Sequence, residues 1–201
     1  MTTIQLDQDI LHSAGLGAFF RPSEVEKLGI TYDQLVRLVQ AGVVERVQRG
    51  LYRLVSTELT EHATVAAVCA RVPNAVVCLI TALNFYEIGT QLSPRVWIAI
   101  HHKARPPRLP QIRTRLVRFS GAAWTYGVRE AVFNGVPARI TSPARTIVDC
   151  FRFERLIGRE AALEALHEGL RERKVTVDAL MRTLEELPSR RLSTALEFGV
   201  L

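Results

Sequence analysis

The first sixty residues show a pattern of apolar and polar positions that predicts three helices followed by a β-hairpin. Apolar residues recur at helical spacing three times, and two short extended runs follow, joined by a turn that ends in Gly50. The predicted helices span residues 4–14, 22–28 and 31–41, and the predicted strands span 43–47 and 51–55. This order is typical of a winged helix-turn-helix, in which the third helix enters the major groove of DNA and the hairpin touches the backbone or the minor groove.

The third helix begins with a recognisable signal. Thr31 and Gln34 have the spacing of a capping box, in which each side chain satisfies a backbone N–H group of the other residue. Leu35 and Leu38 fall on one face of this helix, whereas Arg37 points away from that face. The pattern therefore predicts a helix with a buried side and a polar side that can meet DNA.

Residues 57–201 mix helical and extended patterns. The Asn134-Gly135 pair between two extended runs predicts a tight hairpin, and Ser142 followed by Pro143 predicts a helix start. The other predicted elements are helices over 58–71, 75–88, 159–173, 176–187 and 189–198 and strands over 95–100, 113–119, 128–133 and 136–141. The predicted fold class is α+β, with a winged helix-turn-helix over 1–56 and a mixed α+β C-terminal domain over 57–201.

Composition excludes several classes of protein. Of the 201 residues, 48% are hydrophobic and 23% are charged, which is unlike a disordered chain, and the longest apolar run is too short to cross a bilayer. The first residues lack the pattern of a signal peptide, so a cytoplasmic location is expected. Three cysteines without a CxxC spacing argue against a disulfide framework or a zinc site. No cofactor or metal is expected.

The distribution of charge is more informative than the net charge of +6. Residues 57–150 carry eleven basic and five acidic side chains, whereas the segments on both sides of them are neutral. Within the predicted winged helix, residues 1–33 hold two basic and five acidic side chains, and residues 34–55 hold four arginines and one glutamate. The part that should face DNA is therefore positive, as contact with phosphate requires.

We expect the third helix and the hairpin to supply the DNA contacts. Arg37 should read base edges, and the arginines that flank the hairpin turn should follow the phosphate backbone. The predicted DNA-binding residues are Thr31, Tyr32, Gln34, Arg37, Gln40, Arg46, Gln48, Arg49 and Arg53. The alternative is a small scaffold whose arginines only solvate its surface.

A proline-rich basic segment lies in the middle of the chain. Its prolines predict a loop, and arginine binds phosphate or carboxylate groups with two parallel hydrogen bonds. The residues that could contact phosphate or a protein partner are Lys103, Arg105, Arg108, Arg113 and Arg115. Three interpretations stay open: a second contact to DNA backbone, a docking surface for an acidic protein, and an ordinary solvated surface.

The motifs of enzymes are weak in this sequence. Glu172-Arg173-Lys174 resembles the E-x-K of metal-dependent nucleases but lies at the end of a charged helical run. His101 and His102 are neighbours on a predicted strand and should face opposite sides. Arg145 and Asp149 lie four residues apart on one helix, which favours a structural ion pair. We therefore predict no active site and no enzymatic activity.

Two segments carry a family resemblance. LGAFFRPSEVEKLGITYDQLVRLVQAGVVERVQRGLYRLV (residues 16–55) resembles the N-terminal domain of the AbiEi-family antitoxins of type IV toxin–antitoxin systems, and ITSPARTIVDCF (residues 140–151) resembles a second motif of that family. The resemblance implies a transcriptional autorepressor that binds an inverted-repeat operator in double-stranded DNA. It also implies that the C-terminal domain counters a nucleotidyltransferase-like toxin, not necessarily in a direct complex.

One other function is compatible with the sequence. A winged-helix regulator without a toxin partner could use its C-terminal domain to sense a ligand or to dimerise. A nuclease targeted by its DNA-binding end is disfavoured, because clustered acidic residues are missing.

Overall fold

The computed structural model describes residues 9–11 and 13–197 and divides the chain into two compact units. The first unit combines residues 1–74, 109–112 and 130–138, and the second combines 75–108, 113–129 and 139–201. The first unit therefore continues past residue 56, where the sequence places the end of the winged helix.

The helices of the first unit follow the expected order. Residues 9–11 and 13 are helical, residue 14 lies in a turn, and residues 4–8 and 12 of the predicted 4–14 helix lie outside the described residues. Helix α2 (Pro22–Glu26) has proline at its first position, and α3 (Tyr32–Gln40) begins at the predicted capping box. Gln34 Oε1 accepts a hydrogen bond from the Thr31 backbone at 2.8 Å, and Thr31 Oγ1 accepts one from the Gln34 backbone at 3.4 Å.

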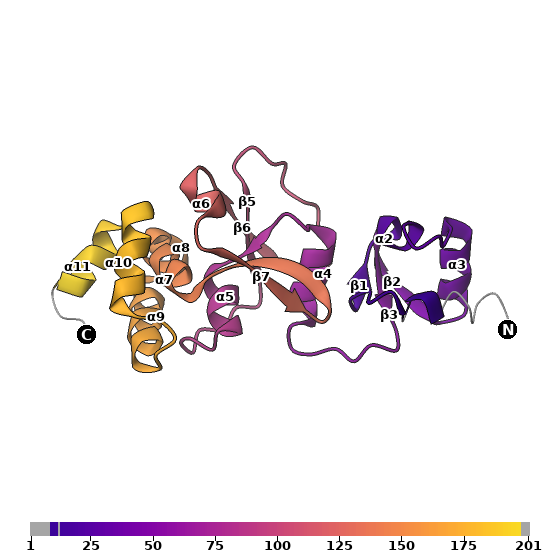
Figure 1. Cartoon of the computed structure of the whole chain (residues 1–201), viewed down its shortest axis with the longest axis horizontal. Helices are drawn as coiled ribbons and strands as arrows, with labels where there is room; N and C mark the ends of the chain where they lie inside the picture. Colours follow the sequence, from indigo (N-terminus) through magenta and orange to yellow (C-terminus); the bar gives the residue numbers. More distant parts are fainter. Residues whose placement is uncertain (1–8, 12, 198–201) are drawn as a thin grey trace. The chain divides into compact units, whose positions relative to one another are not determined.

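A three-stranded antiparallel sheet completes the winged helix. Strands β2 (Val44–Gln48) and β3 (Leu51–Leu54) form the predicted hairpin, and β1 (Phe19–Phe20), which the pattern did not predict, pairs with β3. Figure 1 shows α2 and α3 beside these strands. Phe20, Leu35 and Leu38 are fully buried between the helices and the sheet, so apolar burial fixes the position of α3.

Residues distant in sequence also belong to the first unit. Helix α4 (Ala63–Arg71) begins five residues later than predicted and packs on β1 and β3. The Asn134 carbonyl accepts a hydrogen bond from the Ala18 backbone at 2.8 Å. A Cβ atom on Gly17 would lie 2.6 Å from the Gly135 carbonyl carbon, so the two backbones meet where neither residue has a side chain. The 130–138 hairpin tip is thus an integral part of this unit.

The larger sheet has five strands in the order β6-β5-β4-β8-β7. Its strands are β4 (Val76–Val77), β5 (Val96–His101), β6 (Thr114–Phe119), β7 (Val128–Phe133) and β8 (Val136–Thr141). Strand β5 pairs with β6 in parallel, and β4 pairs with β8 in parallel and with β5 in antiparallel orientation. The β7–β8 turn has positive φ at Asn134 and Gly135, as the sequence predicts.

The expectation of a mostly helical segment over 75–88 is wrong at its start. Val76 and Val77 form the central strand β4, and only Leu79–Phe85 forms a helix, α5. Both valines are fully buried and pair with strands on both sides. A short apolar run does not reveal its period, so only pairing with distant strands decides its structure.

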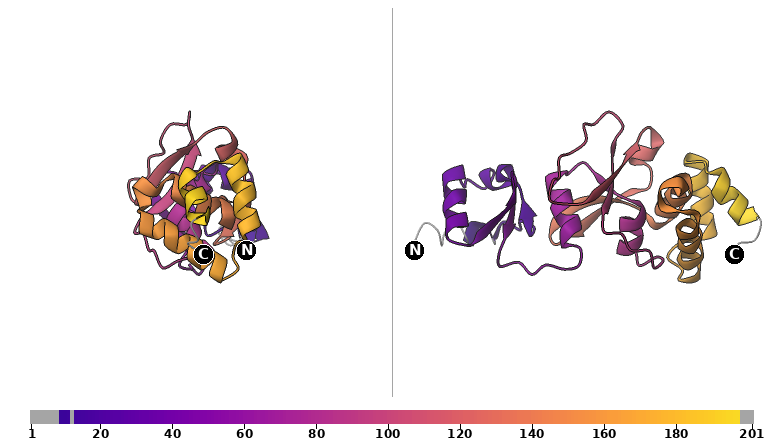
Figure 2. Two further views of the ribbon diagram at one scale, coloured as in Figure 1. Left: turned by 90° about the vertical axis from the view of Figure 1, so that its left-hand side faces the viewer. Right: turned by 180° about the vertical axis from the view of Figure 1, so that it is seen from behind.

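Helices α6 (Ala122–Thr125) and α8 (Glu154–Ile157) are short and were not predicted, whereas four longer helices were. These are α7 (Pro143–Arg152), α9 (Arg159–Arg171), α10 (Val177–Glu186) and α11 (Arg190–Glu197). The right-hand view in Figure 2 shows α7 to α11, coloured orange to yellow, as one group. Ile147, Leu166 and Leu180, from three of these helices, are fully buried in a shared core.

The α+β fold class is confirmed: the first unit contains the winged helix, and the second mixes strands and helices. Among the described helices, none is long and apolar enough to cross a membrane.

The three cysteines are buried free thiols, and burial raises the pKa of the Cys69 thiol to about 12. At neutral pH this thiol is protonated and therefore a weak nucleophile and a weak metal ligand.

Candidate nucleic-acid interface

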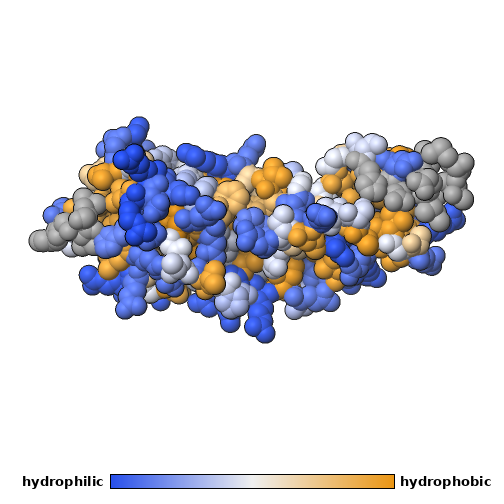
Figure 3. Space-filling view, turned by 90° about the horizontal axis from the view of Figure 1, so that it is seen from below, coloured by the Kyte–Doolittle hydropathy of each residue, from blue (hydrophilic) through white to orange (hydrophobic). Residues whose placement is uncertain are grey.

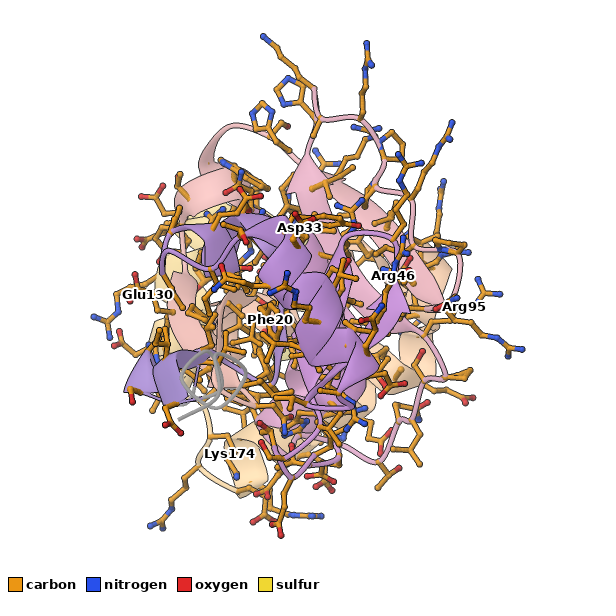
Figure 4. All side chains as sticks on the ribbon, turned by 90° about the vertical axis from the view of Figure 1, so that its right-hand side faces the viewer. Phe20, Asp33, Arg46, Arg95, Glu130 and Lys174 are labelled. Carbon is orange, nitrogen blue, oxygen red and sulfur yellow. The ribbon has the colours of Figure 1, made fainter. Side chains whose placement is uncertain are left out.

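Helix α3 presents an exposed polar face in the first unit. Tyr32, Asp33, Arg37 and Gln40 are exposed, whereas Leu38 is fully buried on the opposite side. Figure 4 looks at this unit and labels Asp33 at the start of α3. The two faces match the spacing in the sequence, so the predicted groove-facing side of α3 is open to solvent.

The polar residues of α3 are not equally available to a ligand. Gln34 is half-buried, and its side-chain oxygen accepts hydrogen bonds from the Thr31 backbone and hydroxyl, both at 2.8 Å. Arg37 is exposed and forms no ion pair within the described part of the chain. Thr31 and Gln34 therefore fix the start of the helix, and Arg37 is the cation that α3 offers.

Tyr32 connects α3 to the wing. Its phenol faces that of Tyr52 on β3: burial raises the pKa of Tyr52, and the neighbouring Tyr32 raises it further. Tyr52 also stacks on Phe20, with ring centroids 6.1 Å apart. This contact holds the helix at a fixed position beside the hairpin, and sequence reasoning missed it because the two tyrosines are twenty residues apart.

The wing carries three arginines in different environments. Arg46 and Arg49 are exposed and form no ion pair with any described residue, and Gly50 closes the turn with φ of +75°. Figure 4 labels Arg46 on β2. Arg53 lies opposite Glu45 in the hairpin and pairs with it at 2.7 Å. A phosphate contact by Arg53 would therefore compete with Glu45.

Gln48 does not face solvent, contrary to the expectation of a DNA contact. Its side chain is only 7% exposed, and neither amide atom has a hydrogen-bond partner among the described residues. The pairing of β2 with β3 shifts between Arg46 and Gln48, which is a β-bulge. A bulge changes the face to which later side chains point, so Gln48 turns inward although Arg46 points outward.

The basic middle segment lies mainly in the second unit, and most of its cations are exposed. Lys103, Arg105, Arg108 and Arg113 are solvent-exposed, whereas Arg115 is half-buried with its guanidinium 5.8 Å from the centre of the Trp97 ring. These four exposed cations could meet phosphate or carboxylate groups.

Arg118, which is not among the predicted site residues, shapes the loop. Its Nη1 donates to the backbone oxygens of His102 at 2.6 Å and Ala104 at 3.0 Å. Arg118 therefore holds the start of the loop in place. The sequence does not reveal this role, because an arginine near the end of a predicted strand has no distinctive pattern around it.

The sequence predicts that His101 and His102 face opposite sides of a continuous strand, and the structure shows otherwise. Strand β5 ends at His101, and the two ring centroids lie 4.4 Å apart. Among the described residues, no group of three histidine, cysteine or acidic side chains could hold a metal ion. The pair therefore brings two imidazole rings together beside the basic loop.

Arg145 and Asp149 form the predicted ion pair inside the second unit. Arg145 Nε donates to Asp149 at 2.8 Å, and the Arg145 guanidinium also donates to the backbone oxygens of Tyr126 and Ala123. Arg152 reaches the other Asp149 oxygen at 2.8 Å. Both residues of the central pair are completely buried, so the cluster ties α7 to the α6 segment and offers no opening to a substrate.

Comparison with known proteins finds a family to which the winged helix is similar. Residues 8–55 match a family model described as a transcriptional regulator, AbiEi antitoxin. This range covers α2, α3 and the β2–β3 hairpin. No curated protein matches the chain.

Proposed function

We propose that this chain represses its own operon, because its residues 8–55 match the model of a family described as a transcriptional regulator, AbiEi antitoxin. In this proposal the winged helix binds an operator in double-stranded DNA. The second unit then supplies the antitoxin function of a type IV system by countering a nucleotidyltransferase-like toxin, and this effect need not require a direct complex.

The observation that carries the proposal is the exposed face of α3 beside a basic wing. Arg37 is unpaired within the described part of the chain and lies on the side of α3 opposite the core. A guanidinium in the major groove binds the two acceptors of guanine with two hydrogen bonds, which distinguishes guanine from the other bases. Arg46 and Arg49 extend the positive surface along the hairpin, where phosphate groups of the backbone would lie.

Two copies of this helix on one operator would require an inverted repeat. Winged-helix and helix-turn-helix proteins place recognition helices in successive major grooves, about 34 Å apart along one face of the duplex. The proposal therefore expects half-sites whose centres are separated by about 10 base pairs or a multiple of one helical turn.

The antitoxin role is tested separately from DNA binding. The chain is co-expressed with the product of the gene next to its own, which the proposal expects to be a toxin, and growth is scored, while a promoter reporter measures repression in the same strain. An Arg37→Ala/Arg49→Ala variant should lose repression but still rescue growth when it is expressed from an unrelated promoter. If wild-type protein represses but never rescues growth, the chain is a regulator without a toxin partner. If it neither represses nor binds its own promoter, the proposal is wrong.

A further inference from the structure

A hollow of about 420 Å³ lies among the C-terminal helices of the second unit. Its apolar wall is formed by Phe151 from α7, Leu163 from α9 and Ala195 from α11. Pockets for small ligands have volumes of about 300–1,000 Å³ and apolar walls with a few polar groups, so this hollow has the size and lining of such a site.

The rim of the hollow is strongly positive. Arg159, Arg190 and Arg191 line it together with one acidic residue, Glu154. Arg191 lies 3.6 Å from Glu154, whereas Arg159 and Arg190 have no ion-pair partner within the described part of the chain. Three guanidinium groups therefore face one carboxylate. In Figure 3 strongly hydrophilic residues gather over the C-terminal helices at the left.

These arginines stand at the starts of helices, and the two on α11 are electrostatically unfavourable there without an anion. Arg159 is the first residue of α9, and Arg190 and Arg191 are the first two residues of α11. The start of a helix carries a positive partial charge and favours acidic side chains. The first turn of α9 has one, Glu160, whereas the first turn of α11 has none. Local conflicts of this kind often mark functional sites, because a bound ligand can offset them.

We propose that this hollow binds a small organic anion that has an apolar or aromatic body. The body packs against Phe151 and Leu163, and a carboxylate or phosphate group meets Arg159, Arg190 and Arg191. The planar guanidinium fork suits both kinds of anionic group. The site does not involve the operator contacts proposed for α3 and the wing, so its test does not depend on whether the chain binds DNA.

Binding is measured on the full chain by isothermal titration calorimetry with three naphthalene probes. The probes are 2-naphthoate, 2-naphthyl phosphate and the neutral 2-naphthalenemethanol. At least one anionic probe should bind ten times more tightly than the neutral probe, and the stronger of the two identifies carboxylate or phosphate as the preferred group. Equal affinity for all three probes, or no binding, would overturn the proposal.

Variants locate the site. Arg190→Ala/Arg191→Ala should weaken binding of the stronger probe at least tenfold. The control Arg95→Ala/Arg129→Ala removes the same charge from exposed positions of the second unit that do not line the hollow and should change affinity less than twofold. Thr194→Glu adds a carboxylate at an exposed position of the rim, so it should abolish anion binding while the circular dichroism spectrum stays unchanged. Undiminished binding by Thr194→Glu, or equal losses in the two arginine pairs, would place the anion elsewhere.

Discussion

Individual arginines of the first unit differ in how strongly their guanidinium groups are engaged. Glu45 holds Arg53, whereas Arg37 and Arg49 form no ion pair with any described residue. An unpaired guanidinium loses no internal ion pair when it binds DNA, so it contributes more of its interaction energy to the complex. Arg37 and Arg49 are therefore the side chains whose removal should affect binding most.

Replacing Arg37 with alanine tests whether α3 reads sequence. If Arg37 binds guanine with two hydrogen bonds, Arg37→Ala should reduce operator affinity by about 1–3 kcal/mol and barely change affinity for a random duplex. Fluorescence anisotropy with both duplexes at one salt concentration measures the difference. Arg37→Lys keeps the charge without the planar fork and is the matched control. An equal loss on both duplexes would assign Arg37 to phosphate instead.

Replacing Asp149 with alanine tests how much the buried ion pair of the second unit contributes to stability. Asp149→Ala should lower the free energy of unfolding by about 3–5 kcal/mol, because it leaves the buried Arg145 charge without its carboxylate. Urea unfolding followed by circular dichroism provides the measurement. Arg152→Ala removes a partly exposed partner of the same carboxylate and should cost about 1 kcal/mol or less. If both variants lower the free energy of unfolding by the same small amount, the buried Arg145 charge does not need Asp149 as its partner.

Among the elements, those with local signals were predictable from sequence. The capping box at Thr31 and the Asn134-Gly135 turn each involve residues within one turn of chain, so their chemistry is visible without the fold. Strands β1 and β4 have two residues each and exist only because distant strands pair with them. Gln48 was misassigned for a related reason: the bulge in β2 depends on its register with β3.

The exposed α3 face was predictable, whereas its internal constraints were not. Helical spacing places Arg37 opposite Leu35 and Leu38, and burial agrees with that arrangement. The interaction of Tyr32 with Tyr52 and the hydrogen bonds from Arg118 to the basic loop both depend on side-chain directions in the folded chain. Periodicity carries no information about such contacts.

The wing should bind DNA without reading its sequence. Arg49 is exposed at the hairpin turn, so Arg49→Ala should weaken binding to all duplexes similarly. It should also reduce the slope of log affinity against log salt by about one, the contribution of roughly one phosphate contact. Titrations over a range of salt concentrations give the slope, with Lys27→Ala on the turn after α2 as a control of equal charge. An unchanged slope would remove Arg49 from the interface.

For the whole molecule, the surplus positive charge lies outside the winged helix. Residues 57–150 carry six more basic than acidic side chains, whereas residues 1–56 are neutral overall. We expect the surplus to provide sequence-independent attraction to DNA, because long-range steering depends on the summed charge. Lys103, Arg105 and Arg108 are the exposed cations of the loop that are suited to this role.

Removing these three charges tests whether the loop supplies sequence-independent attraction to DNA while the winged helix reads the sequence. Lys103→Gln/Arg105→Gln/Arg108→Gln should weaken operator binding at low salt and leave discrimination between operator and random duplex intact, because phosphate contacts carry no sequence information. Anisotropy titrations at two salt concentrations measure both quantities. If the variant binds DNA normally but fails to rescue growth, the loop is an antitoxin surface. If it does both normally, the loop is only solvated surface.

The contribution of residues 130–138 to the first unit has a consequence for synthesis. The Asn134 carbonyl that accepts from the Ala18 backbone and the Gly135 backbone that meets Gly17 both belong to this hairpin tip. Both residues come much later in the sequence than the helices of the first unit. At about 5–20 residues per second, a ribosome takes roughly 3–13 s to add the stretch between residues 74 and 138. The DNA-binding unit of each new chain is therefore finished late in translation, and a message truncated within that stretch would encode no complete repressor.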